Sequence, residues 1–191
     1  MISTRTFPIA IGFFGGIAAI AFALLIGENH VEQAQLAARW TARIGFPIFL
    51  LCYLASSLFK IKPNQLTKTV MKRRRQWGLA FAITHTIHLG ALTYFIDLSG
   101  NSVETTALIG GGFAYFILYV MALTSNGRSV RMLGKYWKPI HSFGIHYLWF
   151  IFTFTYAGRL AHPAQFYEGA FFVSVAMLAL ITRIYARYTS R

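Results

Sequence analysis

The sequence predicts an all-α fold, an integral membrane bundle of six transmembrane helices with both termini in the cytoplasm. Of the 191 residues, 56% are hydrophobic and only 12% are charged, which lies outside the ordinary range of soluble domains. Apolar stretches recur along the chain, each close to the roughly 20 residues that cross a bilayer as a helix. Six spans leave no room for a separate soluble domain, so we expect a single transmembrane domain over residues 1–191.

The six expected spans lie near 7–27, 37–59, 76–97, 106–125, 137–160 and 166–186. The first is expected to be a retained helix and not a signal peptide, because it is about 20 residues long and lacks a small-residue cleavage site. All six are too long for membrane β-strands, which need only about 10 residues. Helices also satisfy the backbone hydrogen bonds that lipid cannot. Three consecutive glycines at 110–112, within the fourth span, predict close helix packing.

The distribution of charge orients these spans. Lys and Arg gather in the second and fourth connections and in the C-terminal tail, whereas all five acidic residues lie in the opposite connections. By the positive-inside rule both termini are cytoplasmic, and we expect a multi-pass protein of the inner (plasma) membrane. The net charge of +13 is then a topology signal, with the lipid bilayer as its partner, and nucleic acid is not expected as one.

Four histidines lie inside the expected spans: His85 and His88 in the third, His141 and His146 in the fifth. Ionisable residues are costly in a membrane, so each is a candidate functional residue. At about 100° per residue, the first two share a helix face and the second two do not. Neutral imidazoles from two facing helices suit a six-coordinate haem iron that transfers electrons. A zinc site is less suitable, because the chain has one cysteine, Cys52, and no HExxH motif.

Two motifs carry a family resemblance. Residues 73–81 read RRRQWGLAF, with His88 ten residues after Gly78, and residues 134–141 read GKYWKPIH. These resemble the RR-x-x-GL-x-x-F…LH and GK-x-W-x-x-LH patterns of the ferric-reductase-like transmembrane domain superfamily. That superfamily includes MsrQ-like haem-binding membrane subunits of bacterial methionine sulfoxide reductases, and the membrane cores of NADPH oxidases and ferric reductases. The similarity is concentrated in roughly residues 72–160.

The resemblance implies one haem b, with His88 and His141 as its axial ligands to iron. Family members with two stacked haems carry a further histidine about four helical turns along each helix. Here those positions hold Ser102 and Phe154. A second stacked haem is therefore not expected.

Depth along the helices favours a different pair. At about 1.5 Å per residue, His88 lies about 16 Å beyond Trp77, whereas His141 lies only about 6 Å beyond Trp137. His146 is deeper than His141 and is the alternative ligand from the fifth span. His85 is the alternative from the third.

Arg39 and Arg43 lie one helical turn apart at the outer end of the second span. At that spacing they could pair with haem propionates or with a quinone headgroup. Snorkelling of both side chains to the membrane interface is the alternative interpretation.

Together these features predict a membrane b-type cytochrome that relays single electrons. The expected electron donor is a cytoplasmic flavin reductase or a membrane quinol, and a flavin or quinone is expected as a further cofactor. The expected acceptor is a redox partner in or across the membrane. If the chain is MsrQ-like, that partner is periplasmic. The alternative is a haem- or metal-dependent membrane enzyme acting on a lipophilic substrate, in which one histidine ligates and another transfers protons. A third possibility is a subunit that keeps the fold and binds no cofactor.

Overall fold

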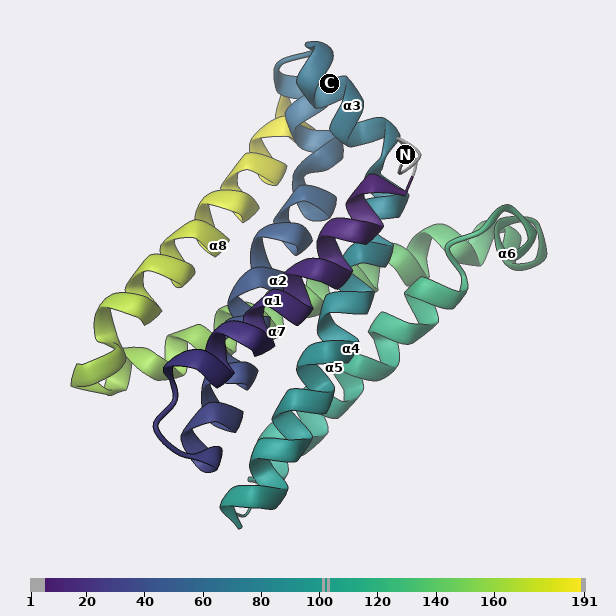
Figure 1. Ribbon diagram of the computed structural model, residues 1–191. Helices are drawn as coiled ribbons and strands as arrows, with labels where there is room; N and C mark the ends of the chain where they lie inside the picture. Colours follow the sequence, from purple (N-terminus) through teal and green to yellow (C-terminus); the bar gives the residue numbers. More distant parts are fainter. Residues whose placement is uncertain (1–5, 101, 103, 190–191) are drawn as a thin grey trace. The chain divides into compact units, whose positions relative to one another are not determined.

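The computed structural model describes residues 6–100, 102 and 104–189, and the regular structure in these ranges is entirely helical (Figure 1). The long helices are α1 (Phe7–Ile26), α2 (His30–Ile61), α4 (Arg74–Ser99), α5 (Thr105–Leu123), α7 (Trp137–Gly158) and α8 (Phe166–Tyr188). Two short helices, α3 (Gln65–Lys72) and α6 (Gly127–Leu133), and three 3-10 turns (Gly134–Tyr136, Arg159–Ala161 and Pro163–Gln165) complete the order. The all-α prediction is confirmed for this part of the chain.

Within the described residues, five helical segments are long and apolar enough to cross a membrane: α1, α2, α4, α5 and Pro163–Tyr188, which contains α8. Several of their large apolar side chains, such as Leu25, Phe116 and Leu178, are exposed, as expected of a surface that faces lipid. The chain is therefore a multi-pass membrane protein. The 22-residue α7 is long enough to span but is not among the five, because its polar side chains lower its hydropathy. The sixth span remains a prediction.

The chain divides into two compact units, which are described separately. Unit 1 comprises Met1–Cys52 and Lys68–Glu104, and unit 2 comprises Tyr53–Thr67 and Thr105–Arg191. Unit 1 thus holds α1, α4 and most of α2, and unit 2 holds α5 to α8 with the end of α2.

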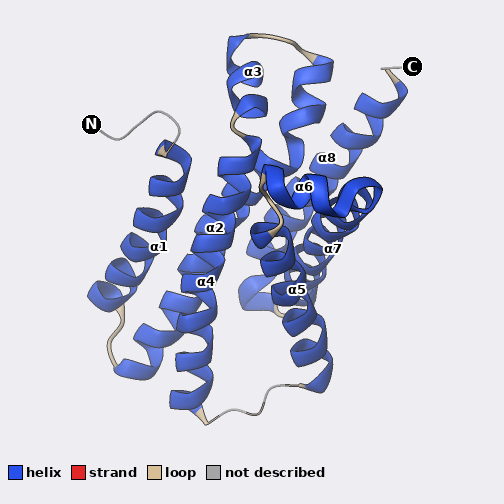
Figure 2. Cartoon of the chain, turned by 90° about the vertical axis from the view of Figure 1, so that its right-hand side faces the viewer, coloured by secondary structure: helices blue, strands red, loops and turns tan. Residues whose placement is uncertain are grey.

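In unit 1, α1 packs closely and in parallel against one face of α4 (Figure 2). The approach depends on glycine. A Cβ atom at Gly12 would lie 2.5 Å from the Ala80 carbonyl oxygen, and one at Gly16 would lie 2.7 Å from a methyl carbon of Ile87. The Thr84 hydroxyl donates a hydrogen bond to the Gly12 carbonyl at 2.9 Å. These contacts place α1 along the face of α4 that carries Ala80, Thr84 and Ile87.

The neighbouring face of α4 meets α2, which runs antiparallel to α4. Four pairs of residues define the register: Thr41 with His88, Gly45 with His85, Phe49 with Phe81, and Cys52 with Gly78. In each successive pair the α2 residue advances by about one helical turn while the α4 residue recedes by about one turn. This register decides what surrounds His85 and His88.

In unit 2, α7 is antiparallel to both α5 and α8. Against α5, a Cβ atom at Gly144 would lie 2.3 Å from the sulfur of Met121, and the Tyr147 hydroxyl donates to the Gly110 carbonyl at 3.1 Å. Against α8, the Trp149 indole donates to the Ala176 carbonyl at 2.8 Å. The α7 helix is thus held on both sides by hydrogen bonds from its aromatic residues.

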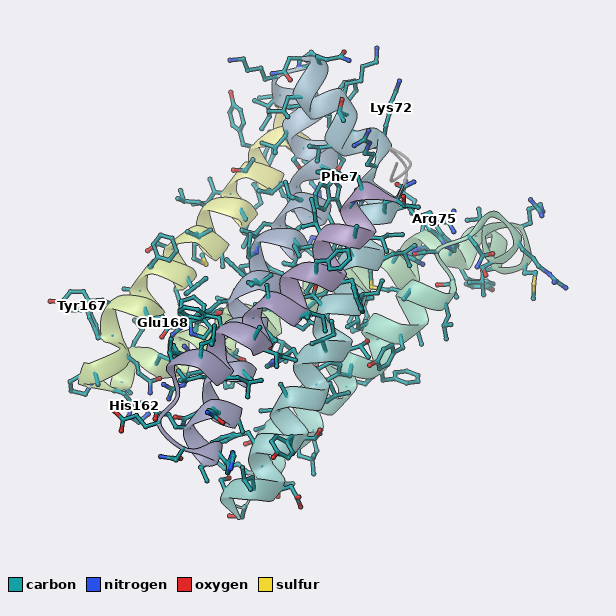
Figure 3. The ribbon with its side chains drawn as sticks, in the orientation of Figure 1. Phe7, Lys72, Arg75, His162, Tyr167 and Glu168 are labelled. Atoms are coloured by element: carbon teal, nitrogen blue, oxygen red, sulfur yellow. The ribbon has the colours of Figure 1, made fainter. Side chains whose placement is uncertain are left out.

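The turn between α7 and α8 is closed by an ion pair. Arg159 and Glu168 are 2.5 Å apart, and the Arg159 guanidinium also lies 4.9 Å from the centre of the Tyr156 ring. Figure 3 shows Glu168 at this turn with His162 and Tyr167. In unit 1, Figure 3 places the cationic residues Lys72 and Arg75 at the end where α1 begins.

Three details differ from the sequence predictions. Helix α2 begins at His30, seven residues before the predicted span, because its first turns are polar and carry no hydropathy signal. For the same reason, the sequence predictions did not include the helices α3 and α6. The prediction of close packing at the glycine run was wrong for Gly111 and Gly112. Outside the backbone of its own helix, a Cβ built on either residue has no described atom within 4 Å.

Candidate functional site

The two histidines of α4 share one face, as their spacing predicts, and that face meets α2. The centres of the His85 and His88 rings are 5.4 Å apart. His85 is 8% exposed, and its ring packs 4.2 Å from the ring of Phe81. The two imidazoles therefore form one small polar cluster where α4 packs against α2.

Gly45 makes the space that the His85 imidazole occupies. A Cβ atom at this position would lie 2.3 Å from Cε1 and 2.6 Å from Nδ1 of His85. Ordinary contacts between non-bonded heavy atoms are about 3.5–4.0 Å long, so no other residue type fits there unless His85 moves. The absence of one side chain on α2 thus fixes where a histidine of α4 can lie.

Thr41, one turn before Gly45, holds the other histidine. Its hydroxyl oxygen lies 3.1 Å from Nδ1 of His88 and 2.7 Å from the Ala37 carbonyl oxygen. A carbonyl only accepts, so the single hydroxyl proton belongs to the Ala37 bond, and the hydroxyl oxygen accepts a hydrogen bond from His88. In its neutral form His88 therefore carries its proton on Nδ1 and its lone pair on Nε2.

His146, on α7, has the same tautomer for a simpler reason. Its Nδ1 lies 2.7 Å from the Ser142 carbonyl oxygen, one turn earlier in the helix. Since that carbonyl can only accept, Nδ1 carries the proton and Nε2 the lone pair of the neutral ring. The ring also stands edge-on to Tyr53, with centres 5.8 Å apart. A backbone carbonyl on the far nitrogen is a common way to orient an imidazole that binds a metal.

His141 is arranged the other way round. Its Nε2 lies 2.9 Å from the Thr124 hydroxyl, which itself donates to the Val120 carbonyl at 2.6 Å, so Nε2 carries the proton. The Trp137 ring stacks on the imidazole at 4.1 Å, and its indole donates to the Thr124 carbonyl at 2.9 Å. In this arrangement His141 ties the end of α5 to the start of α7.

The two arginines of α2 lie in unit 1. The Arg43 guanidinium lies 4.6 Å from the centre of the Trp40 ring, and that ring meets Phe22 of α1 edge-on at 5.1 Å. Arg39 is half-buried. The stacking on Trp40 gives Arg43 a structural role, and an anionic partner for Arg39 and Arg43 remains a prediction.

Sequence reasoning missed the residues that position the histidines. Thr41, Gly45 and Thr124 were not singled out, although a threonine or glycine within a long apolar helix is a readable signal of close packing or hydrogen bonding. Arg183 was counted only among the Lys and Arg residues of the C-terminal tail that orient the spans. In the structure it donates to the Tyr53 carbonyl, and its guanidinium lies 4.3 Å from the centre of the Tyr53 ring.

The site residues belong to two units, His85 and His88 to unit 1, His141 and His146 to unit 2. In the part of the chain that the structure describes, no three His, Cys, Asp or Glu residues form a group that could hold a metal ion. Hydrogen-bond geometry defines the tautomers of three of the four candidate histidines, His88, His141 and His146.

Comparison with known proteins finds relatives of this chain. A protein of Pasteurella multocida named protein-methionine-sulfoxide reductase heme-binding subunit MsrQ is 25% identical over 174 residues, which cover 84% of this chain and 84% of that protein. Proteins of the same name from Cronobacter sakazakii (25% over 135 residues, 64% of this chain and 68% of that protein) and Klebsiella pneumoniae (27% over 138 residues, 64% and 67%) are also similar. No family model matches the chain, and no solved structure matches it. The chain is thus similar to MsrQ subunits over most of its length.

Proposed function

We propose that this chain is the haem-binding membrane subunit of an oxidoreductase, a b-type cytochrome that carries one haem and relays single electrons. The observation that carries the proposal is His88, a largely buried imidazole whose Nδ1 is held 3.1 Å from the Thr41 hydroxyl so that Nε2 bears the lone pair. The similarity to proteins named as heme-binding subunits, over 84% of the chain in one case, supports it.

The donor chemistry fits a haem better than a bare metal ion. A six-coordinate haem iron needs only two protein ligands, and neutral imidazole is a common one. A zinc site would ordinarily need three or four protein ligands close together. The imidazoles lie on separate helices, and His88 and the competing ligand His146 each have a hydrogen bond on Nδ1 that leaves Nε2 for an iron, which matches the requirement of a haem.

The ligand from α7 is one of two histidines. The family motif favours His141, and the tautomer favours His146, whose Nδ1 is bonded to the Ser142 carbonyl at 2.7 Å. To ligate through Nε2, His141 must give up its hydrogen bond to Thr124. A net cost of about 1 kcal/mol for one neutral hydrogen bond does not prevent ligation. We propose His88 and His141 as the axial pair, with His146 as the competing ligand that the experiment below separates.

The residues of this chain then have defined tasks. A bound haem supplies a one-electron couple, and the protein holds it, orients it and keeps water away. Thr41 orients His88, and Gly45 admits His85 beside it.

Thr124 holds His141. The Ser142 carbonyl orients the competing ligand His146. The apolar side chains of the helices that carry these histidines would keep water away from a bound haem.

We propose the finer topology and partners as the sequence predicts them. The α7 helix forms a sixth span, both termini face the cytoplasm, and the protein lies in the inner membrane. Electrons enter from a cytoplasmic flavin reductase or a membrane quinol and leave to a periplasmic redox partner, with a flavin or quinone as the second cofactor. The proposed anionic partners of Arg39 and Arg43 are haem propionates or a quinone headgroup.

The absorption spectrum of the purified protein tests the proposal, together with single replacements by Ala. We expect a sharp reduced spectrum of low-spin haem that is lost in His88→Ala. The same loss in His141→Ala, with His146→Ala retaining the haem, identifies His141 as the second ligand, and the reverse result identifies His146. A high-spin spectrum in the wild type would favour the rival function, a haem enzyme with an open coordination position. Low-spin haem that survives in His88→Ala, or a wild type that binds none, refutes the proposal.

A further inference from the structure

Thr41 is buried at the point where α2 meets the proposed haem ligand. It is 0% exposed, and its hydroxyl makes contacts of two kinds. The first kind is to backbone carbonyls of its own helix, as many helical threonines make, to Ala37 at 2.7 Å and to Ala38 at 3.1 Å. The second kind reaches across to Nδ1 of His88, 47 residues further along the chain, at 3.1 Å. Only this contact with His88 joins two helices.

The direction of this hydrogen bond follows from proton counting. Thr41 has one hydroxyl proton, and the Ala37 carbonyl oxygen at 2.7 Å is at the usual separation for O–H···O. If the hydroxyl donated to His88 instead, two acceptor oxygens would lie 2.7 Å apart with no proton between them. The arrangement with Nδ1–H of His88 as the donor satisfies all the groups.

We propose that Thr41 is a positioning residue for the haem, which fixes His88 in the tautomer that presents Nε2 to iron and raises the basicity of that nitrogen. The inference rests on the proposed function, because it assumes that His88 ligates. It extends that function to a residue of a different helix. A hydrogen-bond acceptor on the far nitrogen of a metal-bound imidazole increases the electron density on the ligating nitrogen, and a more basic ligand favours ferric over ferrous iron.

Replacement of Thr41 by Val keeps the shape of the side chain and removes the acceptor. Losing such a partner typically weakens metal binding about 10–100-fold, so we expect haem affinity to fall by about that factor. The midpoint potential should rise, because a less basic His88 stabilises the ferric state less. The ferric low-spin EPR signal should shift for the same reason. Thr41→Ser, which keeps the hydroxyl, should retain the wild-type haem affinity, midpoint potential and EPR signal.

Thr93→Val is the matched control. Thr93 lies on α4, the helix of His88, and its hydroxyl bonds that helix, to the Leu89 carbonyl at 2.9 Å. Its replacement should therefore leave potential, EPR signal and haem content unchanged. A Thr41→Val protein that matches Thr93→Val in all three measurements overturns the inference. In that outcome, loss of the haem in His88→Ala would still uphold the proposed function, so the two failures are distinguishable.

A second measurement does not depend on haem. In haem-free protein labelled with ¹⁵N at its histidines, the NMR signals that disappear in His88→Gln belong to His88. We expect a protonated Nδ1 and an unprotonated Nε2 in the wild type and in Thr41→Ser, and a mixture of tautomers in Thr41→Val. A wild-type His88 protonated on Nε2 would overturn the inference whatever the haem shows.

Discussion

Replacement of Gly45 by Ala tests the packing that admits the candidate histidines. The new Cβ atom would lie 2.3 Å from Cε1 of His85, over 1 Å inside the usual contact distance of about 3.5 Å. The imidazole cannot easily yield, because it is 8% exposed and lies against Phe81 and His88. Overpacking of this kind typically costs about 1–3 kcal/mol. At about 2–4 °C per kcal/mol for a chain of this size, we expect a fall of roughly 2–12 °C in Tm.

Thermal unfolding in detergent, followed by tryptophan fluorescence, measures this fall. Gly90→Ala on α4 is the control, because no described atom lies within 4 Å of a Cβ built there, and it should be neutral or slightly stabilising through helix propensity. His85→Ala removes the atoms that clash, so Gly45→Ala should cost much less in that background than in the wild type. Equal stability of Gly45→Ala and Gly90→Ala, with no coupling to His85, would refute the packing of α2 on α4.

Three further predictions concern the scaffold. Gly12→Ala should lower Tm more than Gly144→Ala, as paired melting curves would show. The new Cβ at position 12 meets the rigid backbone of Ala80 at 2.5 Å, whereas the one at position 144 meets the flexible side chain of Met121 at 2.3 Å. Trp149→Phe should cost about 1 kcal/mol, measured by the same unfolding assay, through loss of the 2.8 Å hydrogen bond to α8. Arg159→Gln should cost about 1 kcal/mol or less, and a double-mutant cycle with Glu168→Gln should show coupling between these two residues, which are 2.5 Å apart.

The long helices could be predicted because each contains an apolar run that, as a helix, is about as long as a bilayer is thick. The ends of these helices could not be predicted where polar residues continue the helix. Helix α2 extends over 32 residues, and its first turns contain Glu32, Gln33 and Gln35, which hydropathy assigns to a loop. Helix α6 left a different signal, since Asn126 accepts a hydrogen bond from the Ser129 backbone at 2.9 Å and marks the start of a helix.

The candidate site was predictable only within a helix. The three-residue spacing of His85 and His88 places both on one face whatever surrounds α4, and the structure confirms this. Thr41 and Gly45 are readable as polar or small residues of an apolar helix, but the histidine that each one meets depends on the register of α2 against α4. No local pattern encodes a register between residues as far apart in the chain as Thr41 and His88, which are separated by 47 positions.

The same register explains why both histidines depend on α2. Thr41 and Gly45 are four residues apart and His85 and His88 three, so each pair spans about one turn of its helix. In antiparallel helices, one alignment brings Thr41 to His88 and Gly45 to His85 together, and a slip of a single residue rotates the α2 face by about 100° and breaks both contacts. The absence of a side chain at Gly45 lets the two helices approach. This approach brings the Thr41 hydroxyl to 3.1 Å from Nδ1 of His88. Packing and ligand orientation are therefore one property of this helix pair.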